Sequence, residues 1–155
     1  MIKTMCFLLI ASVAFIYSSC SGSDSTDSPA LKKGNYSYTI SDSSGKSLVE
    51  GMLKIDSVKK EPKSTDYVVM GSYTITKMTN DTTYMSLSAL REGDLRGYYN
   101  ESLKFININT NPQIADANVF INATVNGNNI KGGWSFSTFR SGHAEGGLFN
   151  ANKTK

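Results

Sequence analysis

Residues 117–130 read ANVFINATVNGNNI, and this stretch carries the clearest fold signal in the chain. Alternate positions from 117 to 125 are apolar, with Asn118, Asn122 and Thr124 among the residues between them. This period of two is typical of a strand that buries one face. Asn126-Gly127 follows, and a tight hairpin turn favours both residue types because they accept positive φ. The stretch therefore predicts an antiparallel hairpin.

The same alternation recurs along the rest of the chain after residue 33, with short turns rich in Gly, Asn, Asp and Ser between the runs. The expected strands are 34–41, 47–58, 66–79, 82–91, 94–99, 103–109, 116–126 and 129–139, with a ninth run at 143–151. The tightest hairpin is expected between 82–91 and 94–99, across Glu92-Gly93. No helix is expected.

Short connections favour an up-and-down meander, and closing the meander removes its exposed edges. The sequence therefore predicts an all-β domain, a single antiparallel eight-stranded up-and-down β-barrel. A β-sandwich of the same strands is the alternative.

Length and composition exclude several classes of protein. With 155 residues, the chain is sized for one domain and is too short for a multidomain enzyme. Two cysteines do not build a disulfide scaffold, and a net charge of +3 does not indicate a nucleic-acid partner. Lys59, Lys60 and Lys63 form a small basic cluster, expected as an exposed loop that could speed encounter with an acidic partner.

The N-terminal segment is predicted to target the protein. A short positive start with Lys3 precedes an apolar run over 6–17, which is too short for a membrane span of about 20 residues. Residues 1–19 are therefore interpreted as a signal peptide. Residues 20–33 contain the Ser- and Asp-rich stretch 21–29, expected as a flexible linker, and residues 34–155 form the barrel domain.

Tyr17-Ser18-Ser19-Cys20 resembles a bacterial lipobox, and the chain resembles the small envelope lipoproteins of Bacteroidetes. Tyr17 departs from the usual aliphatic residue at that position. The resemblance implies a diacylglyceryl group on the Cys20 thiol and an outer-membrane location, because two acyl chains anchor a protein stably. An ordinary secretory signal is the alternative. The serines and aspartates of the linker also resemble the tract that directs such lipoproteins to the cell surface.

Gly34, one further residue and the aromatic Tyr36 open the first strand of the expected meander. This arrangement resembles the calycin group, which includes lipocalins and avidins. The resemblance covers roughly residues 34–151 and implies a barrel fold. Lipocalins have tryptophan at the position of Tyr36, whereas the single tryptophan here is Trp134, and their C-terminal helix has no counterpart in this sequence.

Six aromatic residues fall on the expected inward faces and are candidates to line a ligand cavity: Tyr36, Tyr38, Tyr67, Tyr73, Trp134 and Phe136. An eight-stranded barrel is wide enough either to be filled by side chains or to hold one small ligand. Tyr98 and Tyr99 must face opposite sides, so one of them is expected to be exposed and could mark a partner surface.

Asparagines are frequent between residues 107 and 129. Outward amides could bind sugar hydroxyls or another protein, or could simply keep a strand face wet.

The search for catalytic chemistry gives one weak candidate, the pair His143 and Glu145, which would share a strand face. One histidine and one carboxylate are too few for a structural zinc site, so no metal is expected. Nucleophile elbows, phosphate loops and dinucleotide motifs are missing, and no cofactor is expected. Ser25 and Thr82 follow aspartates in a pattern that resembles Bacteroidetes O-glycosylation sites.

Three functional hypotheses follow. The first is a lipid-anchored, non-enzymatic protein of the cell envelope that binds a small apolar ligand or a protein partner. The second is an envelope inhibitor or immunity-type protein that acts through exposed loops. The third is a weak hydrolase that uses His143 and Glu145.

Overall fold

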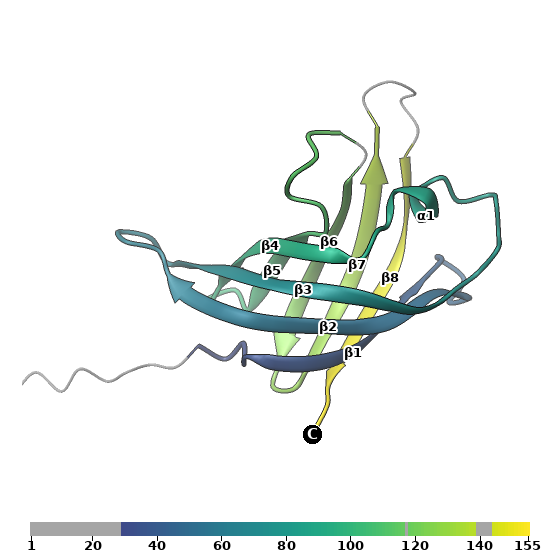
Figure 1. The fold of residues 1–155 in the computed structure, drawn as a ribbon. Coiled ribbons are helices and arrows are strands. Elements are labelled where there is room, and N and C mark those ends of the chain that lie inside the picture. The colour runs from purple at the N-terminus through teal and green to yellow at the C-terminus, as the bar shows by residue number, and fades with distance from the viewer. Residues whose placement is uncertain (1–28, 117, 139–143) are drawn as a thin grey trace, which may run out of the picture.

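Eight antiparallel strands form a closed barrel in which each strand pairs with its neighbours in chain order (Figure 1). This computed structural model describes residues 29–116, 118–138 and 144–155. The strands are β1 (Gly34–Ser41), β2 (Ser47–Lys60), β3 (Asp66–Met78), β4 (Gly93–Asn100), β5 (Phe105–Asn109), β6 (Asn118–Asn126), β7 (Asn129–Ser137) and β8 (Ala144–Lys153). The predicted eight-stranded up-and-down barrel is confirmed.

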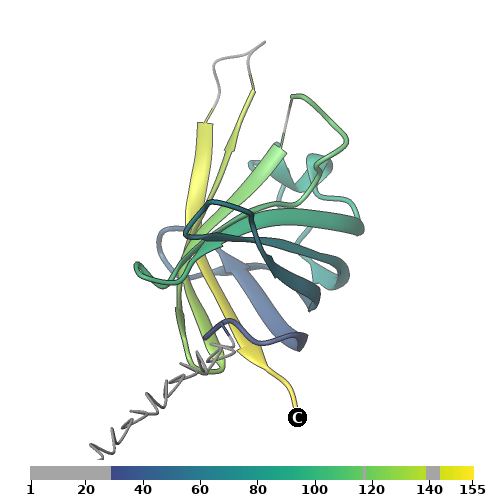
Figure 2. The same cartoon turned by 90° about the vertical axis from the view of Figure 1, so that its left-hand side faces the viewer.

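Pairing between the first and last strands closes the barrel. Tyr36 of β1 lies opposite Lys153 of β8, and Ser41 lies opposite Leu148. Strands β2 and β3 run across β6, β7 and β8 in Figure 1, and Figure 2 shows the same walls from the side.

The alternation in the sequence becomes the division between core and surface. In β6, Val119, Ile121 and Val125 are at most 3% exposed, while Asn122 and Thr124 face solvent. Ala117, which began this pattern, lies outside the described residues. Burying one face of each strand in this way gives the barrel a single continuous core.

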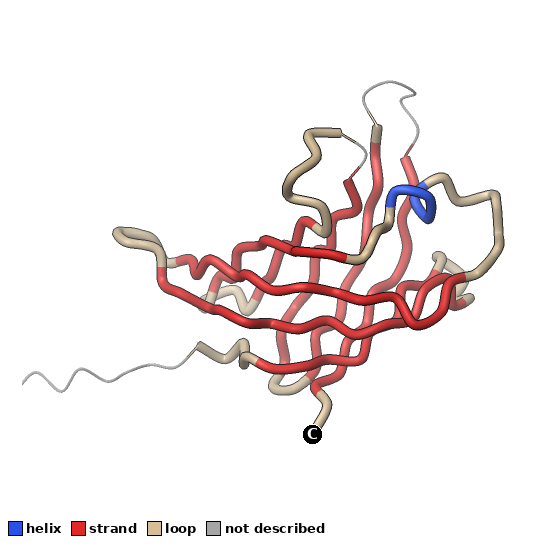
Figure 3. The backbone as a smooth tube through the Cα atoms, in the orientation of Figure 1, coloured by secondary structure: helices blue, strands red, loops and turns tan. Residues whose placement is uncertain are grey.

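The predicted strand 82–91 is wrong, and so is its hairpin with 94–99. This segment is a connection that contains the one-turn helix α1 (Ser86–Ala89), drawn in blue in Figure 3. Local hydrogen bonds favour the turn: Asp81 Oδ1 accepts from the Thr83 amide at 3.1 Å, and Ser88 Oγ donates to the Met85 carbonyl at 2.7 Å. The run predicted as a ninth strand therefore becomes β8, the eighth. Among the described residues, no helix is both long and apolar enough to cross a membrane.

The two ends of the barrel carry different segments. One end, here called the tether end, holds the start of β1, the turns 61–65, 101–104 and 127–128, and the C-terminus. The opposite end, here called the far end, holds the turn 42–46, the connection 79–92 with α1, and the loop 110–116. The C-terminus and α1 lie at opposite ends in Figure 1.

Each end of the barrel is closed by apolar side chains from outside the strands. Leu31, within the predicted linker 20–33, is only 1% exposed and belongs to the core at the tether end. The core therefore begins before Gly34, the predicted start of the domain. At the far end, Leu87 of α1 and Leu90 are 7% and 5% exposed. Burying each of these leucine side chains stabilises the fold by about 1.5–3 kcal/mol. This gain favours a conformation in which the leucines cover the two ends of the barrel.

Candidate functional site

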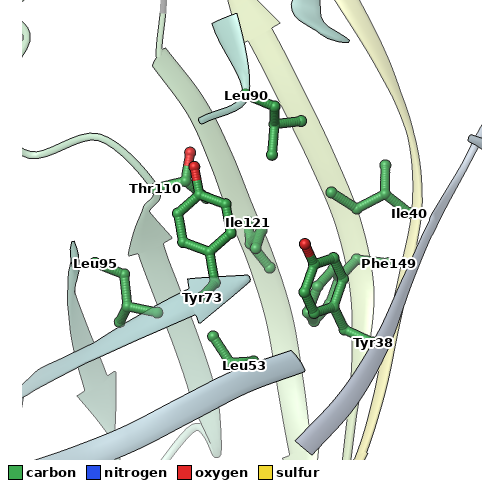
Figure 4. A pocket seen from close by; sticks show the side chains of 9 residues that line it. All are labelled: Tyr38, Ile40, Leu53, Tyr73, Leu90, Leu95, Thr110, Ile121 and Phe149. Atoms are coloured by element: carbon green, nitrogen blue, oxygen red, sulfur yellow. The ribbon is translucent and has the colours of Figure 1, made fainter. Parts of the chain in front are cut away.

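The six aromatic residues predicted to face inward are all buried, between 0% and 9% exposed. They do not form one group. Tyr38 and Tyr73 lie near each other on opposite sides of the same small cavity (Figure 4), and the Tyr38 ring stacks on Phe149 with centroids 6.1 Å apart. Tyr67 instead packs against Tyr99, at 6.2 Å, and neither lines that cavity.

Three of these aromatic side chains donate their polar hydrogen to backbone carbonyls, two in the barrel wall and one in the segment before β1. Tyr36 Oη donates to the Lys32 carbonyl at 2.6 Å, Tyr38 Oη to the Thr74 carbonyl at 3.2 Å, and Trp134 Nε1 to the Ser41 carbonyl at 2.7 Å. A buried tyrosine or tryptophan normally finds such a partner. These donors therefore hold the barrel together and are not presented to a ligand.

Burial also raises the pKa of two tyrosine hydroxyls, those of Tyr38 and Tyr99, and keeps them protonated. It raises the pKa of Tyr38 well above its ordinary value, with smaller contributions from Tyr73 and Glu92. Burial, with the nearby Glu101 carboxylate adding to it, raises the pKa of Tyr99 to about 12. None of these hydroxyls is suited to act as a base near neutral pH.

The barrel interior is filled. The cavity that Tyr38 and Tyr73 share has a volume of about 10 Å³, room for roughly one water molecule, whereas ligand pockets run to roughly 300–1,000 Å³. Its lining is Tyr38, Ile40, Leu53, Tyr73, Leu90, Leu95, Thr110, Ile121 and Phe149 (Figure 4). In this conformation the predicted aromatic residues form a packed core and leave no space for a ligand.

Glu145, the carboxylate of the hypothetical hydrolase pair, is engaged with α1. Its Oε1 accepts from the Met85 amide at 2.7 Å, and its Oε2 accepts from the Ser86 amide at 3.0 Å and from Ser86 Oγ. Unpaired amides at the start of a helical turn are commonly satisfied by a carboxylate in this way. Glu145 therefore fastens α1 across the far end. His143 lies outside the described residues.

A second set of contacts ties the connection 79–92 to the turn 42–46. Lys46 Nζ and Asp81 Oδ2 form an ion pair at 2.9 Å, and Tyr84 Oη donates to Asp42 Oδ2 at 3.4 Å. Hydrogen bonds from Thr83 and Lys46 lower the pKa of Asp81 to about 2. This pairing was not predictable from the sequence, because it joins residues 35 positions apart.

Other predicted site residues are only partly placed. Thr82, a candidate for O-glycosylation, is exposed in the connection 79–92. Ser25 and the lipidation candidate Cys20 lie outside the described residues. No cluster of three or more His, Cys, Asp or Glu side chains that could hold a metal ion occurs in the part of the chain that the structure describes.

The outer wall carries a groove. Its volume is about 350 Å³, and its lining is Arg96, Tyr98, Asn107, Asn109, Pro112 and Phe120. Of the residues that line it, the sequence had indicated only the tyrosine and the asparagines as candidate binding groups. Tyr98 is 43% exposed while Tyr99 is buried, which confirms that the two tyrosines face opposite sides.

Strand register explains how these residues meet. Tyr98 of β4 lies opposite Asn107 of β5, and two residues along, Arg96 lies opposite Asn109, which in turn lies opposite Phe120 of β6. Opposite side chains on one sheet face are about 5 Å apart, so these five form one continuous surface.

The groove offers varied chemistry. Two aromatic rings provide flat apolar faces, and the amides provide donors and acceptors. Asn107 Nδ2 donates to Asn122 Oδ1 at 2.8 Å, while no partner for Asn107 Oδ1 is found among the described residues. Arg96 is the only charged residue in the lining, and within the described residues it makes no ion pair. Arg96 and Pro112 also line a neighbouring hollow of about 560 Å³ that extends over β2 and β3.

Comparison of the chain with protein-family models, with curated proteins and with solved structures found no match.

Proposed function

We propose that the protein is a lipid-anchored, non-enzymatic binding module of the bacterial cell envelope, and that it binds its target on the outside of the barrel. The single observation that carries this proposal is the contrast between the two surfaces. The interior leaves about 10 Å³, whereas the outer groove at Tyr98 offers about 350 Å³ with aromatic, amide and guanidinium groups.

Those lining groups favour a ligand rich in hydroxyls, such as a saccharide. Amide side chains exchange hydrogen bonds with hydroxyl groups in both directions, and an exposed aromatic ring packs against an apolar ring face. Arg96 adds a fixed donor array that would favour a ligand carrying a carboxylate.

Titration with a panel of neutral and acidic oligosaccharides, followed by saturation-transfer NMR, tests the ligand class. Tyr98→Ala should abolish the transfer signal, and Thr124→Ala, a change on the outer face of β6 that does not line the groove, should leave it unchanged. Equal signals from both variants, or no signal with any saccharide, would remove the groove from consideration.

The anchor has a separate test. Cys20→Ser should prevent incorporation of labelled palmitate and release the protein from membranes, because the thiol is the only group that can take the diacylglyceryl chain in the expected mature protein. Persistent labelling would contradict the lipobox interpretation.

A second candidate, an inhibitor or immunity-type protein that acts through exposed loops, is supported by two apolar side chains at the far end. Met85 beside α1 and Ile114 in the loop 110–116 are 50% and 45% exposed. Exposed apolar side chains on neighbouring loops can mark a protein interface. If this candidate is right, Met85→Asp together with Ile114→Asp should prevent recovery of a partner from envelope extract, and Tyr98→Ala should not.

A further inference from the structure

We propose that the tether end of the barrel docks onto the anionic phospholipid surface in which Cys20 is anchored. This inference rests on the proposed lipid anchor. It assigns a role to one face of the domain that the binding groove does not use.

Lysine is concentrated at the tether end. Eight lysines lie there against three side-chain carboxylates, those of Glu61, Asp66 and Glu101, an excess of five positive charges among the side chains. The lysines are Lys32, Lys33, Lys59, Lys60, Lys63, Lys104, Lys153 and Lys155. The linker contributes Asp24 and Asp27, whose positions are outside the described residues, and counting both still leaves an excess of three.

These lysines are not neutralised by ion pairs within the described residues, where the three pairs found involve Lys46, Lys54 and Lys77. Two of the three carboxylates are occupied. Glu101 accepts from the Ala30 amide at 3.1 and 3.2 Å, and Asp66 accepts from Asn100 Nδ2 at 2.7 Å. The lysine ammonium groups are therefore available to an external anion.

The far end has the opposite charge balance. Its described segments and the first or last four residues of the adjoining strands carry seven carboxylates against four basic side chains. The carboxylates are those of Asp42, Glu50, Asp81, Glu92, Asp94, Asp116 and Glu145, and the basic side chains are those of Lys46, Lys77, Arg91 and Arg96. The barrel is thus polarised along its length. An anionic surface would attract the tether end and repel the far end.

Apolar groups at the tether end suit the membrane interface. Leu103, in the turn 101–104, is 70% exposed and lies next to Lys104. A hollow of about 200 Å³ has Leu31 and Val58 in its lining together with Lys32 and Lys33. Lysines beside apolar surface fit a phosphate headgroup above acyl chains.

The tether holds this end within reach of the bilayer. From its composition, the predicted linker 21–29 would have a mean span of roughly 16 Å, about twice the screening length of about 8–10 Å at physiological salt. Shorter excursions of the linker would bring the lysines within the screening length of the lipid headgroups. A lysine cluster kept this close to anionic lipid gains attraction with each charge, and a lipid anchor joined to a basic patch binds more firmly than either alone.

The test uses the acylated, full mature protein in vesicles. Leu103→Cys provides a unique thiol for a fluorophore, since Cys20 is acylated, and Ser43→Cys provides the matching label at the far end. A lipid-borne quencher should quench the fluorophore at Leu103→Cys in both kinds of vesicle. The quenching in phosphatidylglycerol-containing vesicles should be at least roughly three times that in phosphatidylcholine alone. The label at Ser43→Cys should show no such difference.

Charge variants give the control. Lys59→Glu with Lys60→Glu should remove the phosphatidylglycerol effect, whereas Lys77→Glu with Arg91→Glu, the same charge change at the far end, should preserve it. Sodium chloride at about 1 M, where screening acts over about 3 Å, should also remove it.

Equal quenching in both lipids, or quenching that both variant pairs leave intact, would overturn the docking. Failure of palmitate labelling would instead overturn the anchor, so the two failures are distinguishable. A preference for nucleic acid or an acidic protein over phosphatidylglycerol vesicles in competition would also overturn the proposal.

Discussion

Gly147 is one of several glycines in the barrel wall where neighbouring atoms leave no room for a side chain. A Cβ built there would lie 2.1 Å from the Ser41 carbonyl oxygen and 2.8 Å from Trp134 Nε1, the two atoms of the Trp134–Ser41 hydrogen bond. Glycine is required here by the close approach of the Ser41 carbonyl and the indole, and not by an unusual backbone angle.

Gly147→Ala should therefore lower the free energy of unfolding by about 1–3 kcal/mol, the usual cost of overpacking. Gly133→Ala is the milder control, because its Cβ would meet a single backbone oxygen at 3.1 Å. Urea unfolding followed by Trp134 fluorescence measures both. A smaller loss for Gly147→Ala than for Gly133→Ala would contradict the steric argument.

Loss of the hydroxyl should destabilise the protein at one buried tyrosine, Tyr36, and not at another, Tyr73. Tyr36→Phe removes the hydrogen bond to the Lys32 carbonyl and should cost about 1 kcal/mol. The Tyr73 hydroxyl lies beside Thr110 without a hydrogen bond of ordinary geometry among the described residues, so Tyr73→Phe should be neutral or stabilising. Thermal unfolding of the two variants gives the comparison, and equal losses would be inconsistent with it.

At the scale of elements, the carboxylate of Glu145 in β8 holds the segment 79–92 in place by hydrogen bonds. Glu145→Ala leaves the amides of Met85 and Ser86 without their partner and should release α1, exposing Leu87 and Leu90. Faster hydrogen exchange over residues 84–90 and increased binding of an apolar dye are expected, with β2 and β3 protected as before. Unchanged exchange in that segment would show that the leucines alone hold it.

Hydrogen bonds to Asp81, first from Thr83 and then from Lys46, give the connection 79–92 a dependence on acid. Hydrogen bonds lower the pKa of Asp81 from 3.8 to about 2 in the folded protein. Its stabilising effect is therefore complete above about pH 4 and is lost as pH falls through 2. Asp81→Asn should flatten the stability profile over this range, as measured by unfolding at a series of pH values. A profile identical to that of the original protein would mean that the Asp81 carboxylate does not contribute to the free energy of unfolding.

The strands were predictable from sequence wherever one face is apolar and the other polar, as in β6 and β7. The connection 79–92 was not, because its turn depends on a carboxylate from β8 and on leucines that bury against distant strands. The inward direction of Tyr38 and Tyr73 was also predictable. Whether they enclose a ligand-sized space was not, because it depends on how tightly several strands pack together. The outer groove was not predicted for a similar reason. The register between β4 and β5 places Asn109 beside Arg96 and Tyr98, and this register cannot be read from either strand alone.

For the whole molecule, the distribution of the core predicts where the folded unit begins. Every buried apolar residue found in the described part of the chain lies between Leu31 and Ala151. A protein that begins at Pro29 should therefore unfold at the same temperature as the full mature protein. One that begins at Gly34 should lose about 2–5 kcal/mol, because it lacks Leu31 and the Lys32 carbonyl. Circular dichroism on heating checks both, and equal stability would place Leu31 outside the essential core.

The pairing of β1 with β8 joins residues as far apart as Tyr36 and Lys153. Contacts of such long sequence separation form slowly, because the ends of a long chain must meet before any pairing stabilises them. A chain exported from its N-terminus would deliver β8 last. Until then β1 and β7 would each lack one neighbour and would be exposed to wrong pairing. Under the proposed lipid anchor, maturation would therefore have an order, in which the N-terminus would reach the membrane before the barrel can close.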